Sequence, residues 1–377
     1  MMQRRVLFIH QQRHIGGGQT YVSELLKKLR HQGYSTELLE SSTFLDTAKF
    51  LLSTKAKIIV WSVYAEYPIL VFILSFLLGK DNYLIIYGIW RLESRQTFWN
   101  DDSPRLRFRQ FRYELKIWLK QSLFCLLASG IVHLSRYGKR LFYSDPLLGL
   151  FSKKDVIIYG GVDKKLFKPI SNEKRERLRK ELGITRSDVI LLMVGRVEKR
   201  KNFIDGLRIL YGLKKRHPNK NILLYLVVSY GKFNDFIYLN RVFAYLNKLK
   251  LGNYVRIVSG VSNKDISYYY QMADVYLMLS KQLETFGLVT LEALSSGCPV
   301  FGYKACATPE IVSYQRNSYL FNRGDIRSLA DAISRYLSLS EAKKQNIRKK
   351  LVKSVSRFTW FNSAQNLLKL TKEVVNG

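Results

Sequence analysis

The sequence predicts an α/β protein made of two doubly wound domains, and three observations carry this prediction. Short runs rich in β-branched residues alternate with helix-like runs along the whole 377-residue chain, which is typical of parallel sheets with helices on both faces. A chain of this length can bury two hydrophobic cores. Its 47% of hydrophobic and 24% of charged residues are globular values that exclude disordered and fibrous classes.

Each strand is expected where an apolar run is bounded by polar or turn residues. In the first half the expected strands are Arg5–His10, Lys57–Val63, Tyr83–Ile89, Gly130–Ser135 and Val156–Val162. In the second half they are Val189–Arg196, Ile222–Val228, Tyr254–Gly260, Val275–Ser280, Pro299–Tyr303 and Ser318–Phe321. Helices are expected between them. Ligands of such sheets bind beyond the carboxyl ends of the strands, and two facing domains would form a cleft.

The predicted domain boundary follows the linker that contains Pro169, because the highly charged run Glu173–Glu181 suits the first helix of a new domain. The N-terminal domain is therefore expected to cover residues 1–170. The short apolar run near the N-terminus, Val6 to Ile9, is interpreted as a first buried strand and not as a signal peptide.

The charge balance predicts an affinity for anions. The chain has 62 Lys and Arg against 29 Asp and Glu, a formal charge of +33, and such a field attracts nucleic acid, anionic membranes or phosphorylated substrates. No nucleic-acid-binding motif supports the first of these, so no nucleic acid is expected as a partner. The three cysteines, Cys125, Cys298 and Cys306, have no metal-ligand spacing, which favours a reducing, cytoplasmic compartment.

Two stretches suggest a membrane contact. In the predicted helix Pro104–Phe124, one side collects Phe108, Phe111, Leu115, Trp118 and Leu119, and the neighbouring shoulder collects Arg105, Arg109, Arg112, Lys116 and Lys120. Such a helix can lie on anionic lipid or can pack its apolar side into its own domain, and the sequence leaves both open. The apolar run Tyr67–Gly79 is shorter than the roughly 20 residues of a spanning helix, so we expect a buried or an interfacial helix.

Three groups of residues are candidates for binding chemistry. Glycines at 16–18 follow the first strand and precede a helix, where backbone amides can approach an anion. Arg196 and Lys201 leave the end of a strand, where two cations could converge on a pyrophosphate, although a solvated charge run would look the same. Glu284 and Glu292 flank a predicted helix mouth, whose free amides could bind phosphate while each carboxylate reaches a different sugar hydroxyl.

These segments resemble the GT-B glycosyltransferases of family 4, the retaining type with the E-x7-E motif, over nearly the whole chain. The matching segments are GGGQTYVSELLKKL, GGVDKKLFKP (Gly160–Pro169), VGRVEKRKN, ETFGLVTLEALSSGCPV, TPEIV (Thr308–Val312) and FTWFNSAQNLL. The GR-x4-K and E-x7-E elements are the specific ones. The resemblance implies a donor-binding domain at residues 171–357 and a final helix, 358–377, that crosses back to the N-terminal domain.

The resemblance also implies a role for each matched residue. Arg196 and Lys201 are similar to the pair that holds the donor diphosphate, Glu284 to the carboxylate on the donor sugar, and Glu292 to the carboxylate on the ribose. Backbone amides around Phe286, Gly287 and Leu288 would cradle sugar and phosphate, and Gly17 and Gly18 would approach the phosphate from the other domain. No metal and no cofactor beyond the nucleotide-sugar is implied. Tyr87 stands where members often carry a histidine, and His133 is interpreted as structural.

The sequence therefore predicts a retaining glycosyltransferase that moves a sugar from a nucleotide-sugar to a saccharide or a lipid-linked acceptor in cell-envelope polysaccharide or glycolipid synthesis. It is expected in the cytoplasm, with a peripheral contact to the inner face of a membrane through Pro104–Phe124. Two alternatives remain open: a GT-B sugar-nucleotide epimerase or phosphorylase, and a non-catalytic GT-B protein that binds polyanions or membranes.

Overall fold

The chain divides into two compact units. The computed structural model describes residues 5–10, 17–40, 43–62, 67–87, 104–150, 155–230, 233–281, 284–312 and 319–375. Unit 1 comprises Met1–Gly161 and Thr359–Gly377, and unit 2 comprises Val162–Phe358.

The division falls nine residues before the predicted boundary at 170/171. Residues 162–170 belong to unit 2 because hydrogen bonds attach their backbone to it. The carbonyl of Phe167 accepts from Ser295 Oγ at 2.7 Å, and that of Lys168 accepts from Gln271 Nε2 at 3.0 Å.

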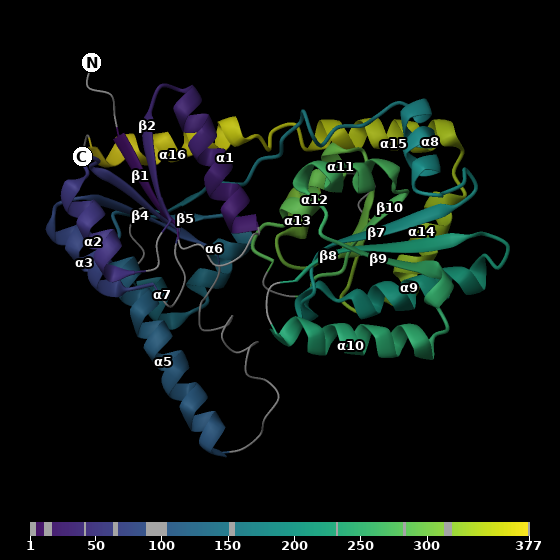
Figure 1. Ribbon diagram of the computed structural model, residues 1–377, viewed down its shortest axis with the longest axis horizontal. Coiled ribbons are helices and arrows are strands. Elements are labelled where there is room, and N and C mark those ends of the chain that lie inside the picture. The colour runs from purple at the N-terminus through teal and green to yellow at the C-terminus, as the bar shows by residue number, and fades with distance from the viewer. Residues whose placement is uncertain are drawn as a thin grey trace. The chain divides into compact units, whose positions relative to one another are not determined.

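Unit 1 contains a parallel six-stranded sheet in the order β2-β1-β3-β4-β5-β6 (Figure 1). Its strands are β1 (Arg5–His10), β2 (Ser35–Glu40), β3 (Ile58–Ser62), β4 (Asp81–Ile86), β5 (Gly130–His133) and β6 (Asp155–Ile157). The strands β1, β3, β4 and β5 are almost entirely buried, as expected for strands with helices on both faces.

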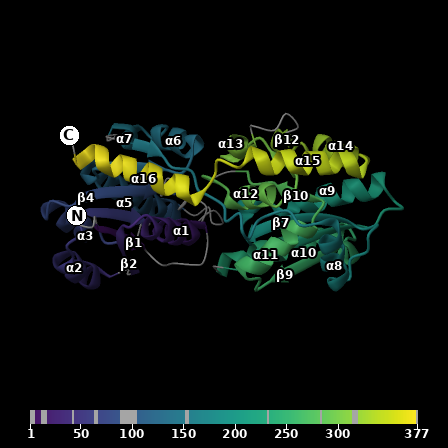
Figure 2. The same ribbon diagram turned by 90° about the horizontal axis from the view of Figure 1, so that it is seen from above.

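The helices of unit 1 form a layer on each face of the sheet. They are α1 (Gly17–His31), α2 (Phe44–Ser53), α3 (Ile69–Leu77), α5 (Pro104–Leu127), α6 (Arg136–Tyr143), α7 (Pro146–Leu150) and α16 (Trp360–Val375). One core joins α2, α3, α5, α6 and α7 to one face of the strands. On the other side α16 lies along α1 (Figures 1 and 2); the rings of Tyr21 and Trp360 meet edge to face at 5.5 Å, and Ser363 Oγ donates to the Tyr159 carbonyl.

Unit 2 repeats the design with a parallel sheet in the order β12-β11-β10-β7-β8-β9. Its strands are β7 (Val189–Arg196), β8 (Ile222–Ser229), β9 (Val255–Ser259), β10 (Val275–Met278), β11 (Val300–Tyr303) and β12 (Tyr319–Phe321). Its helices are α8 (Asn172–Glu181), η1 (Lys199–Lys201), α9 (Phe203–Arg216), α10 (Phe233–Lys248), η2 (Gly252–Tyr254), α11 (Asn263–Met272), α12 (Leu288–Ser295), α13 (Thr308–Val312), α14 (Ile326–Leu337) and α15 (Glu341–Ser354).

The two-domain, doubly wound prediction is confirmed, and all eleven expected strands have a counterpart. The expected ends at Val63, at residues 88–89 and at Ser318 lie outside the described residues. The strand β2 was missed. It is an edge strand with the sequence STELLE, its side chains are half-buried or exposed, and it therefore lacks the apolar run on which the prediction relied.

The predicted amphipathic helix exists as α5, but of its apolar side only Trp118 is partly buried against the rest of unit 1, where its Nε1 donates to Asp145 Oδ1 at 2.7 Å. Phe108, Phe111, Leu115 and Leu119 are exposed, and Trp118 is half-buried. The run at 67–79 forms α3, which buries Val71 and Phe72 and exposes Leu70, Phe76 and Leu77. Within the described ranges, no helix combines the length and the hydropathy that a membrane crossing requires.

The contact between residue 161 and the start of α16 leaves no space for a side chain. A Cβ added to Gly161 would lie 2.1 Å from the backbone nitrogen of Trp360, so Gly161→Ala must displace α16 from α1. We expect a loss of about 2 kcal/mol or more in the free energy of unfolding, measured by urea denaturation. The control is Gly149→Ala in α7, where the added Cβ would have ordinary contacts of 3.6 and 3.8 Å; equal effects of the two variants would contradict the packing described.

Candidate functional site

The strand order of unit 2 identifies one edge where a ligand is expected. After β7 the chain adds β8 and β9 on one side and then returns to place β10 on the other side of β7. Loops that leave adjacent strands in opposite directions open a crevice at their carboxyl ends, where doubly wound folds bind ligands. The loop after β7 carries Arg196 and Lys201, and the loop after β10 leads to Glu284.

At this switch point, three cations and two carboxylates form one chain of ion pairs. Lys201 Nζ lies 2.6 Å and Arg200 Nη1 lies 3.1 Å from Glu284 Oε2. Arg200 Nε also pairs with Glu198, and Glu198 Oε1 lies 2.9 Å from Arg196 Nε. Two of the predicted residues, Lys201 and Glu284, are thus in direct contact, and the predicted Arg196 joins them through two residues that the prediction did not name.

A buried polar network fixes the turn that carries these cations. Asn202 follows η1 in the left-handed region, at φ +59°, and its amide donates to Asp205 and to the carbonyl of Leu279 at the end of β10. Asp205, at the start of α9, also accepts from the Tyr303 hydroxyl at 2.7 Å and pairs with Lys281 at 3.0 Å. The two loops of the switch point are therefore tied together by these contacts in addition to the ion pairs of Glu284.

The side chain of Lys201 packs against Gly195, which has no side chain of its own. Its φ of +154° is unfavourable for other residues, and a Cβ at this position would lie 3.0 Å from Lys201 Cε. Lys201 is consequently 8% exposed and presents its ammonium from a largely buried stem.

The predicted helix mouth is present at the start of α12. Gly287 precedes the helix with φ +90°, Phe286 is buried beside it, and Leu288 is the first helical residue. The first amides of a helix have no intrahelical acceptor, so they are available to an anion. The hydroxyl of Thr290, in the same turn, is buried and has no hydrogen-bond partner in the described part of the chain.

The second predicted carboxylate lies one turn further into α12. Glu292 accepts from the Tyr270 hydroxyl at 3.0 Å. Both Glu284 and Glu292 act on the buried Tyr276 phenol, whose pKa is raised first by burial and then by these two negative charges. The structure thus brings all four residues of the predicted charge set, Arg196, Lys201, Glu284 and Glu292, to one edge of one sheet.

The two carboxylates have opposite electrostatic environments. Burial raises the pKa of Glu284, but the charges of Lys201 and Arg200 outweigh it and hold the pKa at about 2. Burial also raises the pKa of Glu292, and there the opposing effects of the Tyr270 hydrogen bond and Lys201 are too small to compensate, so the pKa is about 7. Glu284 is therefore ionised at neutral pH, whereas Glu292 titrates there.

The predicted residues of unit 1 lie at the switch point of its own sheet, where β1 adjoins β3. Gly17 and Gly18 form the first turn of α1 and are helical, while Gly16 lies outside the described residues. Beside them, His10 Nδ1 and the Tyr87 hydroxyl each lie 2.8 Å from Ser62 Oγ, and Tyr87 donates to the Gly18 carbonyl at 3.5 Å.

The sequence-based prediction of the site did not include four residues that the structure places there: Glu198, Arg200, Asp205 and Tyr270. Glu198 and Arg200 stand inside the run VGRVEKRKN, so the signal was visible, but a charged residue in a loop does not reveal which partner it contacts. Asp205 and Tyr270 lie on helices, where only the fold places them at the site. Within the described ranges, no group of three or more His, Cys, Asp and Glu side chains could hold a metal ion.

Comparisons with known proteins show what the chain is similar to. Residues 174–354 match the family model for "Glycosyl transferases group 1". "Spore coat protein SA" of Bacillus subtilis is 29% identical over 225 residues, 57% of this chain and 58% of that protein. "D-inositol 3-phosphate glycosyltransferase" of Corynebacterium kroppenstedtii is 26% identical over 227 residues, 58% of this chain and 48% of that protein. The chain spans about half the length of these curated relatives.

A solved structure matches the whole chain. Anabaena Alr3699/HepE in complex with UDP and glucose aligns with a TM-score of 0.74 and 18% identity, covering 98% of this chain and 100% of that chain. At this identity the likeness shows a shared fold, which is the predicted GT-B fold with two six-stranded parallel sheets.

The raised pKa of Glu292 predicts a pH-dependent stability difference. Between pH 4.5 and 7 the folded protein binds the Glu292 proton more tightly than the unfolded chain does, so this stabilising contribution is complete below pH 4.5 and is lost as the pH rises to about 7. Glu292→Gln keeps a neutral side chain at every pH. We expect it to exceed the wild type by up to roughly 3 kcal/mol at pH 8, with the difference vanishing near pH 4.5.

The measurement is urea denaturation of both proteins across this pH range. Glu181→Gln, an exposed residue at the end of α8, makes the same change in formal charge and serves as the control. If the free energies of unfolding of the wild type and of Glu292→Gln differ by the same amount from pH 4.5 to 8, Glu292 is not held in its neutral form.

Proposed function

Unit 2 is a glycosyl transferases group 1 domain, and from this premise we propose that the chain is a nucleotide-sugar-dependent glycosyltransferase. It transfers the sugar, with retention of the anomeric configuration, to a saccharide or lipid-linked acceptor in cell-envelope polysaccharide or glycolipid synthesis. The observation that carries this proposal is the placement of Arg196, Arg200 and Lys201 beside the amino end of α12, at the switch point of a doubly wound sheet.

The donor diphosphate is proposed to bind Arg196 and Lys201. A diphosphate needs several cations or amide donors because its charge is concentrated on few oxygens. Glu198 and Glu284 pair with these cations, and we propose that the phosphates take over part of these contacts. As the bond between the anomeric carbon and the phosphate oxygen breaks, negative charge grows on the leaving diphosphate, and fixed cations stabilise it.

The donor sugar and the ribose are assigned to the two carboxylates. Glu284, which stays ionised, is proposed to accept hydrogen bonds from sugar hydroxyls, while the amides around Phe286, Gly287 and Leu288 cradle the sugar and the phosphate. Glu292, one turn away on α12, is proposed to accept from the ribose hydroxyls. The UDP and glucose named for the Anabaena structure support a donor of this class.

The acceptor is proposed to bind unit 1, where Gly17 and Gly18 remain predicted contacts of the donor phosphate. The acceptor hydroxyl attacks the face of the anomeric carbon from which the diphosphate leaves, and no protein side chain is nominated as a covalent nucleophile. A cytoplasmic location remains our prediction, with an anionic membrane surface among the proposed partners because the apolar side of α5 is exposed. The proposed reaction uses no metal and no cofactor beyond the nucleotide-sugar, and nucleic acid is not among the proposed partners.

The two alternatives differ from transfer in what they release. An epimerase or phosphorylase of the GT-B fold would act on its sugar substrate without a hydroxyl acceptor, whereas a transferase releases nucleoside diphosphate in proportion to the acceptor supplied. A non-catalytic relative would bind no sugar-nucleotide. A panel of UDP-, GDP- and ADP-sugars, assayed for released diphosphate with and without a membrane extract, separates transfer from epimerisation and phosphorolysis, and a thermal-shift assay with the same sugar-nucleotides identifies a non-catalytic relative.

The assigned cations give a direct test. We expect Arg196→Ala and Lys201→Ala each to lower kcat at least about 100-fold, because each removes a charge that acts on the leaving diphosphate. Lys199→Ala, which removes an exposed charge from the same turn, should stay within about twofold of the wild type. Diphosphate release with the active donor is the measurement; near-normal rates in both active-site variants would refute the assignment.

A further inference from the structure

The helix layer formed by α2, α3 and α5 exposes apolar side chains on its outer face. Its inner face belongs to one core with the sheet, and α3 packs on α5 through Phe72 and Phe124, whose ring centroids are 4.6 Å apart. Because the helices cover the same face of the sheet, their outward sides point away from it together. On the opposite layer, Phe361 of α16 is the single large hydrophobic side chain exposed among the described side chains of α1 and α16.

Helix α5 is apolar on two opposite sides. One side, which includes Ile117, Phe124 and Cys125, is buried in the core. Phe108, Phe111, Leu115 and Leu119 follow the helical repeat about half a turn away, and Phe108 and Phe111 are 64% and 61% exposed. A surface helix of a monomeric protein needs only one apolar side, so the second indicates a partner.

Helix α3 continues this apolar surface. Its outward residues Leu70 and Leu77 are 61% and 74% exposed, one on each end of the helix, and Leu45 and Leu52 are similarly exposed on α2. Isolated exposed leucines are ordinary in soluble proteins, but adjacent helices that share outward apolar rows form an interaction surface.

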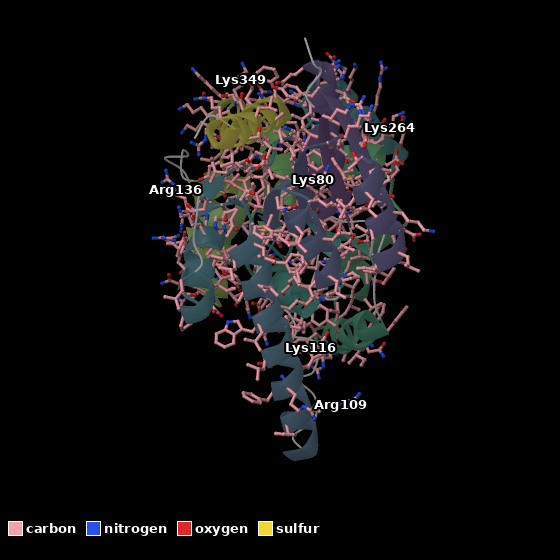
Figure 3. All side chains as sticks on the ribbon, turned by 90° about the vertical axis from the view of Figure 1, so that its left-hand side faces the viewer. Lys80, Arg109, Lys116, Arg136, Lys264 and Lys349 are labelled. Carbon is pink, nitrogen blue, oxygen red and sulfur yellow. The ribbon has the colours of Figure 1, made fainter. Side chains whose placement is uncertain are left out.

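The charges beside this surface identify the partner. Arg109, Arg112 and Lys116 follow one shoulder of α5, are exposed, and have no carboxylate partner among the described residues. Figure 3 looks at unit 1 from the side of α2 and α3 and shows Arg109 and Lys116 on the part of α5 that extends from the rest of the unit. An apolar row with a basic shoulder complements an anionic lipid surface, where hydrocarbon and phosphate lie at adjacent depths.

We propose that the outer faces of α3 and α5 form one composite surface that docks unit 1 on an anionic bilayer, with α5 inserted by its aromatic row and α3 adding apolar area beside it. The proposal extends the membrane partner named under the proposed function from a single helix to a two-helix surface. It rests on the surface of unit 1 alone and is therefore independent of the donor chemistry.

The experiment is sedimentation of the full-length protein with vesicles of phosphatidylcholine alone or of equal parts phosphatidylcholine and phosphatidylglycerol. The wild type should bind the anionic vesicles at low salt. Phe108→Ser with Phe111→Ser on α5, and separately Leu70→Ser with Leu77→Ser on α3, should each lower the partition coefficient at least about tenfold. Phe361→Ser on the opposite layer, 52% exposed, is the matched control and should bind like the wild type.

A charge variant tests the choice of an anionic partner. Arg109→Gln, Arg112→Gln and Lys116→Gln together should lower binding to anionic vesicles by about fivefold per removed charge and leave binding to neutral vesicles unchanged. An equal loss on both lipids would refute the anionic preference.

Three results would overturn the proposal. The first is no vesicle binding by the wild type. The second is loss of binding in the α5 variant but not in the α3 variant, which would refute the composite surface. The third is a dimer in light scattering that the same variants dissociate, which would make a second copy of the chain the occupant. A thermal shift with the active nucleotide-sugar, measured on every variant, checks folding and separates failure of docking from failure of the proposed transferase.

Discussion

The ion pairs between Lys201, Arg200 and Glu284 hold the candidate site together. Each cation is largely removed from water, and a buried charge is tolerated only with a partner. The partners are carboxylates from two loops, Glu198 after β7 and Glu284 after β10. Within this chain of ion pairs, three cations stand against two carboxylates. The ion pairs therefore fix the two loops relative to one another, and under the proposed function this limits the reorganisation that donor binding requires.

The same arrangement separates the two carboxylates of the E-x7-E motif. Glu284 lies before the helix and contacts two cations, whereas Glu292 lies inside the helix and contacts a tyrosine hydroxyl. Equal residues on one short segment thus have pKa values on opposite sides of the ordinary glutamate value. The different roles proposed for them, sugar and ribose recognition, come from the family resemblance, and the two surroundings differ as well.

In unit 1 the helix α5 has two apolar sides, and only one of them is buried. The predicted apolar side of α5 was correct as a pattern, but a pattern cannot say what covers it. The residues that bury α5, Ile117, Phe124 and Cys125 among them, form a second apolar row on the other side of the helix. Because apolar residues lie on two opposite sides of the helix, the sequence pattern does not mark one side as the buried one. Only the packed structure distinguishes the row that belongs to the core from the row that faces outward.

The sequence by itself determined the two doubly wound domains, the strands with continuous apolar runs and the helix mouth at Gly287, and it nominated the four charged residues as candidates, because these depend on local periodicity and on short motifs. It did not determine the edge strand β2, whose polar residues carry no such signal. Only the tertiary structure decided that Glu198 and Arg200 connect Arg196 to Glu284, that Asp205 fixes the turn, and that residues 162–170 belong to unit 2. These facts depend on contacts between residues that are distant in the chain and on the loss of hydration when those residues are buried. Neither can be deduced from the spacing of residues in the sequence.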